Sequence, residues 1–254
     1  DYGFYNLDSV PLTLADAKLQ FSEKIMQDNG ILPWHIQDMM DKLTKAFREG
    51  RRNEILFLAG DLGHYIGDAH MPLHTSSNHD GQLTNQKGIH SFWESQLPEY
   101  FGEGYTLRVN EATYIKDIPA ATWDIIRHSH SLADSLLKVE RDQMTVYAGK
   151  DLYRRDPKGE IAKNIFGRNV YSDQFATSYH DALQGMVNDQ MRRAVQVLAD
   201  FWYTAWVNAG RPDLSLLDNP EVTESNRKKY EAEYSNYKKG KVNGFKGERE
   251  YRGY

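Results

Sequence analysis

Apolar side chains recur every three or four residues along several long stretches of this chain. Side chains with this spacing lie on one face of an α-helix, and that face packs against neighbouring helices. Glycine or proline stands at most ends of these stretches, as expected where helices begin or stop. The pattern predicts an all-α fold whose main helices cover residues 13–30, 33–50, 55–71, 119–137 and 172–209.

The predicted architecture is a single multi-helix bundle domain over residues 1–210. The chain has 254 residues, which is enough to bury a sizeable core. Residues 211–254 form a polar C-terminal tail that we expect to be partly helical or mobile. From residue 226 onward the tail contains nine Lys or Arg against four Glu, with five Tyr between them. This composition is typical of a solvated tail or of a segment that holds nucleic acid or another anionic surface.

The composition excludes several classes of protein. Cysteine is absent, which rules out disulfide scaffolds, thiolate zinc sites and cysteine nucleophiles. The net charge of -5 does not favour a chain that binds polyanions over its whole surface. No apolar run approaches the roughly 18 residues that a membrane-spanning helix requires, so we expect no transmembrane segment.

Two pairs of metal-ligating side chains stand four residues apart: His64 with Asp68, and His90 with Glu94. Because a helix turns about 100° per residue, side chains at this spacing project from one face. An isolated pair of this kind is more often a solvated surface pair. Two pairs and a further imidazole, His74, in one short stretch favour a metal site instead.

The donor types indicate zinc. Imidazole and carboxylate ligands suit this ion, and a catalytic zinc site takes three protein ligands and leaves one position for water. His74, His90 and Glu94 form such a set. Pro72 is expected to end the preceding helix and so to redirect His74 toward a neighbouring metal.

Two stretches carry a resemblance to a known family. Gly-His-Tyr-Ile-Gly-Asp-Ala-His-Met-Pro-Leu-His at 63–74 and Gly-Ile-His-Ser-Phe-Trp-Glu at 88–94 resemble motifs of the zinc-dependent phospholipase C and single-strand-specific zinc nuclease superfamily. That family consists of all-helical enzymes that hydrolyse phosphoester bonds with three clustered zinc ions. The resemblance runs more loosely to about Gly210 and does not cover the tail.

The resemblance implies a role for each matched residue. His64 and Asp68 would hold a first zinc ion, with Asp68 bridging to a third, and His74, His90 and Glu94 would hold a second. Asp68, His74 and Glu94 are the residues expected to take part directly in catalysis. Glu94 resembles the phospholipase branch, since the nucleases usually have Asp at this position.

The family's remaining ligands lie upstream of these motifs, and the sequence offers no match for them. The chain begins at Asp1-Tyr2-Gly3, which looks like the sequence just past that upstream region, so we expect that an N-terminal segment has been removed or that the chain is a degenerate member. Only the second zinc site then has a full set of protein ligands. The resemblance also implies a periplasmic or extracellular location.

Other ionisable side chains near the motifs have two interpretations. Asp61 lies one turn before His64 and is either an outer carboxylate that orients the imidazole or a solvated side chain. His79 and Asp80 lie in the polar loop 75–87, where we expect them to be exposed to solvent rather than bound to metal.

The sequence thus predicts a zinc-dependent phosphoester hydrolase that uses a metal-activated water. Its substrate would be a phospholipid, which we place slightly ahead of single-stranded nucleic acid. The alternative is a zinc-binding helical protein that has lost catalysis because the upstream ligands are missing. A third and weaker interpretation is a metal phosphohydrolase built on His180 and Asp181, for which we prefer a structural role.

Overall fold

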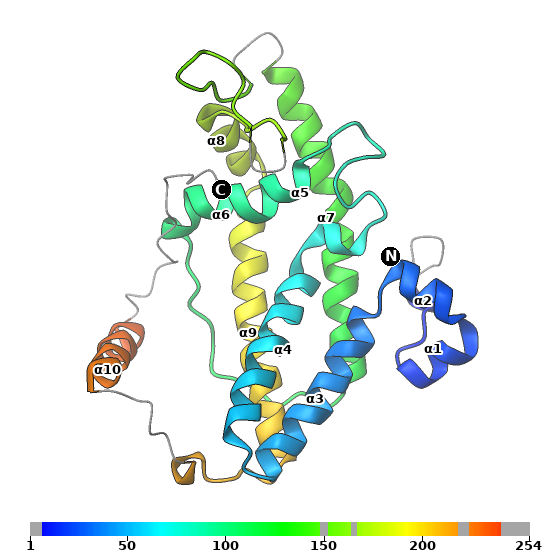
Figure 1. Cartoon of the computed structure of the whole chain (residues 1–254), viewed down its shortest axis with the longest axis vertical. Helices are drawn as coiled ribbons and strands as arrows, with labels where there is room; N and C mark the ends of the chain where they lie inside the picture. Colours follow the sequence, from blue (N-terminus) through cyan, green and yellow to red (C-terminus); the bar gives the residue numbers. More distant parts are fainter. Residues whose placement is uncertain (1–6, 148–151, 164–166, 218–223, 240–254) are drawn as a thin grey trace. The chain divides into compact units, whose positions relative to one another are not determined.

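The computed structural model describes residues 7–147, 152–163, 167–217 and 224–239 (Figure 1). Helices dominate these ranges, which contain isolated antiparallel bridges but no β-strand, so the predicted all-α fold is confirmed. No helix in the described ranges combines the length and apolar character needed to cross a membrane. The α-helices are α1 (Leu14–Gln20), α2 (Glu23–Asn29), α3 (Leu32–Arg48), α4 (Arg52–His70), α5 (Ile89–Ser91), α6 (Leu97–Phe101), α7 (Ile118–Val146), α8 (Asp173–Ala182), α9 (Met186–Asn208) and α10 (Glu224–Lys238).

The chain folds into two compact units. Unit 1 comprises Asp1–His70, Thr106–Arg127 and Met191–Asn243, and unit 2 comprises Met71–Tyr105, His128–Gln190 and Gly244–Tyr254. The long helices α7 and α9 contribute residues to both units. The boundary near residue 210 between a domain and a tail stays a prediction, and α10 is a helix within the segment predicted as tail.

Unit 1 has a core in which α3 and α4 pack side by side (Figure 1). Trp34 on α3 and Trp123 on α7 meet edge to face, with ring centroids 5.6 Å apart. Their indole N–H groups donate to the backbone carbonyls of Pro11 at 3.0 Å and Leu12 at 3.1 Å, respectively. Buried indole N–H groups need such acceptors, so these bonds fasten the segment before α1 to the core.

The stretch 13–30 forms two helices, α1 and α2, where the apolar spacing predicted one. Thr13 caps α1 as expected, because its hydroxyl accepts a hydrogen bond from the N–H of Asp16. The chain then becomes extended at Phe21, and the Ser22 hydroxyl caps α2 by accepting from the N–H of Ile25. Phe21 remains buried. The apolar spacing therefore continues through the break between the two helices, and the spacing alone does not predict the break.

The stretch 172–209 is also broken, into α8 and α9. Gln184 and Gly185 have φ angles of 51° and 85°, in the left-handed region that interrupts a right-handed helix. Leu183 and Val187, on either side of this turn, are both buried. The apolar residues therefore keep their spacing through the turn, which explains why the sequence predicted one helix.

Unit 2 contains a cluster of aromatic rings beneath the segment that carries His90 and Glu94. The ring of Phe92 lies 4.4 Å from that of Tyr171 and 5.2 Å from that of Tyr179. All three rings are buried. Because Phe92 lies between His90 and Glu94 in sequence, this packing fixes the backbone from which both side chains project.

Candidate metal centre

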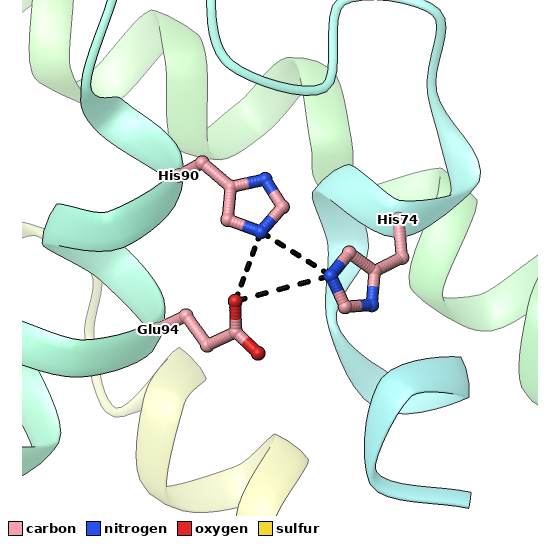
Figure 2. A group of neighbouring side chains, drawn as sticks. All are labelled: His74, His90 and Glu94. Atoms are coloured by element: carbon pink, nitrogen blue, oxygen red, sulfur yellow. Dashed lines mark hydrogen bonds and ion pairs between the residues drawn. The ribbon is translucent and has the colours of Figure 1, made fainter. Parts of the chain in front are cut away.

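His74, His90 and Glu94 come together in unit 2 (Figure 2). The Nε2 atoms of the two histidines are 3.2 Å apart, and the Glu94 Oε2 atom lies 2.9 Å from His90 Nε2 and 3.8 Å from His74 Nε2. Two segments supply these atoms: the 3₁₀ turn Pro72–Thr75, and the short helix α5 with the π-helical turn Phe92–Gln96 that follows it. π-helical turns are rare in proteins, and those that occur are often found at functional sites.

The helix before Pro72 ends, as predicted. The helix α4 ends at His70, and the chain continues as a 3₁₀ turn with Pro72 at its start. The Thr75 hydroxyl donates to the Pro72 carbonyl at 2.6 Å, and His130 Nδ1 lies 2.9 Å from the Thr75 carbonyl. These two bonds hold the turn that presents His74.

The hydrogen bonds of His90 show which of its nitrogens can bind a cation. Its Nδ1 atom lies 2.7 Å from the His79 carbonyl oxygen, which can only accept, so Nδ1 carries the proton. In a neutral imidazole, Nε2 then presents a lone pair, and this lone pair faces the Glu94 carboxylate at 2.9 Å. Two acceptors this close repel each other unless a proton or a metal ion lies between them.

A proton and a metal ion compete for this position. The hydrogen bond to Glu94 raises the pKa of His90, against the opposing effect of burial, so in the metal-free chain the proton takes this position more readily than in an ordinary histidine. A proton bridges one pair of atoms, whereas a metal ion can bind all three donors at once. Binding of the metal should therefore weaken as the pH falls.

The spacing of the donors is that expected around a tetrahedral metal ion such as zinc. Ligands at about 2.0–2.1 Å from a tetrahedral ion lie roughly 3.3 Å from one another. The three donor separations, 2.9, 3.2 and 3.8 Å, bracket this value. The site is half-buried, with 40% of the Glu94 side chain exposed, so solvent reaches the carboxylate. His74, His90 and Glu94 could thus hold a metal ion.

The loop between the two ligand segments is folded by its own side chains. Asn78 accepts from the N–H of Leu83 and donates to Thr84, closing the loop on itself. Gly81 has a φ of 68°, and a Cβ atom there would lie 2.6 Å from the backbone oxygen of Gln86. The loop therefore requires glycine at this position. Its ordered backbone places the His79 carbonyl against His90.

Asp80 departs from the expectation for this loop. Asp80 is buried, whereas the polar sequence of the loop predicted exposure to solvent. Its carboxylate forms an ion pair with Arg168 at 3.1 Å. The Asp80 Oδ1 atom also accepts from the N–H of Gly88 at 3.0 Å. His79 is exposed, as predicted. Asp80 is thus a structural anchor within the loop.

A buried glutamate joins the same loop to α7. Glu140 is fully buried, and its two carboxyl oxygens accept from the Tyr171 hydroxyl at 2.8 Å and from the Gln86 amide at 2.6 Å. The Gln86 amide also donates to the Leu137 carbonyl at 2.7 Å. Burial raises the pKa of Tyr171, and the nearby Glu140 adds to this effect, so the phenol remains a proton donor.

A pocket of about 280 Å³ opens beside the donor group. Its lining residues are His79, Asp80, His90, Ser91 and Arg168. All five have polar side chains, and His90 is shared with the donor group. A group of a bound ligand in this pocket would therefore lie directly beside the candidate metal position.

The other predicted pair of metal ligands, His64 and Asp68, lies on α4 in unit 1. The His64 Nε2 atom is 3.4 Å from Asp68 Oδ2, and 70% of the His64 side chain is exposed. Asp61 is partly exposed and forms no hydrogen bond to His64 in the described ranges, and its role stays a prediction. Because this pair and the donor group belong to different units, their participation in one metal cluster stays a prediction.

His180 is held by contacts with aromatic side chains. Its Nε2 atom lies 2.9 Å from the Tyr105 hydroxyl, and its ring stacks on Phe101 with centroids 4.1 Å apart. Burial lowers the pKa of His180. In the described part of the chain, neither His180 nor Asp181 belongs to a group of three potential metal ligands, which favours the structural role preferred above.

Comparisons with protein-family models, with curated proteins and with solved structures find no match to this chain.

Proposed function

We propose that this protein is a zinc-dependent hydrolase of phosphoester bonds. The observation that supports the proposal is the convergence of one carboxylate oxygen and two imidazole nitrogens in a partly open site. Zinc bound to such donors lowers the pKa of a coordinated water toward about 7 and neutralises charge on a phosphoryl oxygen. The two motifs resemble those of the zinc phospholipase and nuclease superfamily, and this resemblance is the reason for proposing a phosphoester as the substrate.

In this proposal the protein orients the His90 imidazole and sets the net charge of the bound ion. The His79 carbonyl keeps the proton of His90 on Nδ1, so that Nε2 remains available as a ligand. Two neutral imidazoles and one carboxylate leave a bound divalent ion with a net positive charge. A phosphodiester anion is therefore attracted to the site. The resemblance also implies zinc binding by His64 and Asp68 on α4, and that proposal is separate from the group of His74, His90 and Glu94.

The substrate would be a phospholipid or single-stranded nucleic acid, in a periplasmic or extracellular location. The acidic balance outside the tail, together with the glutamate at position 94, places the phospholipid slightly ahead. Comparing turnover of a choline-type phospholipid with that of single-stranded DNA distinguishes the two substrates. Greater turnover of the DNA would reverse the order.

The experiment that tests the proposal is hydrolysis of a chromogenic phosphodiester by the purified chain. We expect activity with zinc, its loss after removal of zinc by a chelator, and its return when zinc is restored. Magnesium added in place of zinc serves as the control, because it prefers oxygen ligands and octahedral geometry. Activity that survives complete chelation, or no activity with any zinc loading, would contradict the proposal.

A second candidate is a zinc-binding protein without catalysis. One observation favours it: in the described ranges, the donor group of His74, His90 and Glu94 is the only cluster of three potential ligands. Elemental analysis separates the two candidates. A single zinc ion with no hydrolysis supports the binding protein, whereas additional zinc ions support an enzyme with a larger cluster.

A further inference from the structure

We infer that Arg168 is a positioning residue for the candidate metal centre. Through Asp80 it holds the peptide group whose carbonyl fixes the imidazole of His90. The inference rests on the proposed zinc site and adds to it a residue that lies far from both motifs in the sequence. Its support comes from a continuous series of contacts that runs from Arg168 to His90.

The first contact is a two-pronged ion pair. Arg168 Nη1 lies 3.2 Å from Asp80 Oδ1, and Arg168 Nη2 lies 3.1 Å from Asp80 Oδ2. The planar guanidinium matches the carboxylate in this geometry, which fixes orientation as well as distance. Only 11% of the Asp80 side chain is exposed, so the pair is partly shielded from water.

The second step passes through the peptide group between His79 and Asp80. Its carbonyl oxygen belongs to His79 and lies 2.7 Å from His90 Nδ1. Its N–H belongs to Asp80 and donates to the Gln82 side chain at 2.9 Å. A shift of the Asp80 side chain would therefore turn or displace the carbonyl that orients His90.

The Arg168–Asp80 pair also lies at the start of the helix that carries His90. The N–H of Gly88 donates to Asp80 Oδ1 at 3.0 Å, and Gly88 immediately precedes α5. A Cβ atom at Gly88 would lie 3.8 Å from the Cδ atom of Arg168, which places the arginine side chain beside this glycine. Asp80, paired with Arg168, thus holds the N–H of Gly88 just before α5, and its own peptide group carries the acceptor for the Nδ1 proton of His90.

A purely electrostatic role for Arg168 predicts the opposite effect on metal binding. Removing the guanidinium charge leaves the Asp80 carboxylate unneutralised near the site, which on its own would strengthen binding of a cation. A positioning role predicts weaker binding, because the His79 carbonyl and His90 lose their alignment. The sign of the change in zinc affinity separates the two roles.

The test is the zinc affinity of the full chain, measured by competition with a chromogenic chelator, for the wild type, Arg168→Gln and Arg168→Lys. We expect about a tenfold loss in both variants, at the lower end of the 10–100-fold effect of outer contacts on metal ligands. Lysine should not restore binding, because it lacks the planar fork. The imidazole ¹⁵N spectrum of the zinc-bound chain should show a weakened Nδ1–H signature for His90 in both variants.

Arg154→Gln is the matched control. Arg154 belongs to unit 2 and pairs with Asp173 at 2.6 Å, so this variant also removes one arginine from an ion pair with an aspartate. It should bind zinc within about twofold of the wild type, and urea denaturation of all variants checks that they fold. If Arg168→Gln does not fold, Arg168→Lys and its ¹⁵N spectrum provide the test.

The outcomes distinguish this inference from the proposed function. Variants of Arg168 that bind zinc as tightly as the wild type, or more tightly, overturn the positioning role and leave the zinc site standing. An equal loss in Arg154→Gln also overturns the positioning role. A wild-type chain that binds no zinc overturns the proposed function and this inference together.

Discussion

Replacing His90 with alanine should weaken zinc binding by at least about a hundredfold. Outer contacts to metal ligands typically contribute 10–100-fold to affinity, and a direct ligand should contribute more. His90 contacts both other members of the group, since its Nε2 faces His74 and Glu94, while its Nδ1 is held by the His79 carbonyl. Hydrolysis of a chromogenic phosphodiester should fall in parallel. Isothermal titration with zinc measures the affinity directly.

His79→Ala is the control for this variant. The contact from His79 to His90 comes from its backbone carbonyl, which alanine retains. We therefore expect zinc affinity within a few fold of the wild type, although the same imidazole group has been deleted. Similar losses in His79→Ala and His90→Ala would mean that His90 has no special place in the site.

Glu140→Ala should lower the free energy of unfolding by about 2–5 kcal/mol. The change leaves the Tyr171 hydroxyl and the Gln86 amide without their buried acceptor, and each unsatisfied group costs about 1–3 kcal/mol. A cavity adds to this cost because Glu140 is fully buried. Urea denaturation followed by circular dichroism gives the change in stability.

The comparison variant for this prediction is Glu140→Gln. Its amide oxygen can still accept one of the two hydrogen bonds, so we expect a smaller loss of about 1 kcal/mol. Because Gln86 belongs to the loop that reaches His90, zinc affinity should also fall more in Glu140→Ala than in Glu140→Gln. Equal stability of Glu140→Ala and the wild type would show that this buried network does not stabilise the fold.

Much of the helical fold could be predicted from apolar spacing, because helix formation and the burial of one face depend on local sequence. The ends of α3 and α4 follow from Pro33, Gly50 and Pro72, which restrict the backbone directly. The breaks at Phe21 and Gln184 could not be predicted in this way. At both breaks the apolar residues keep helical spacing, so the turn leaves no trace in the pattern.

The candidate site, like the fold, could be predicted from the sequence only in part. His90 and Glu94 could be paired from their spacing, since one helical turn brings them together. Asp80 and the His79 carbonyl could not be recognised, because a backbone acceptor has no sequence signature and a polar loop predicts exposure. The partner of Asp80, Arg168, lies 88 residues away in the chain. Contacts of this kind depend on the tertiary fold.

X-ray absorption spectroscopy at the zinc edge tests the central claim most directly. For the zinc-loaded chain we predict a four-coordinate ion bound by two imidazole nitrogens, one carboxylate oxygen and one further oxygen, at about 2.0–2.2 Å. His90→Ala should remove one imidazole from this set. A zinc environment without imidazole, or one that is the same in the wild type and His90→Ala, would contradict the assignment of His74, His90 and Glu94 as the metal centre.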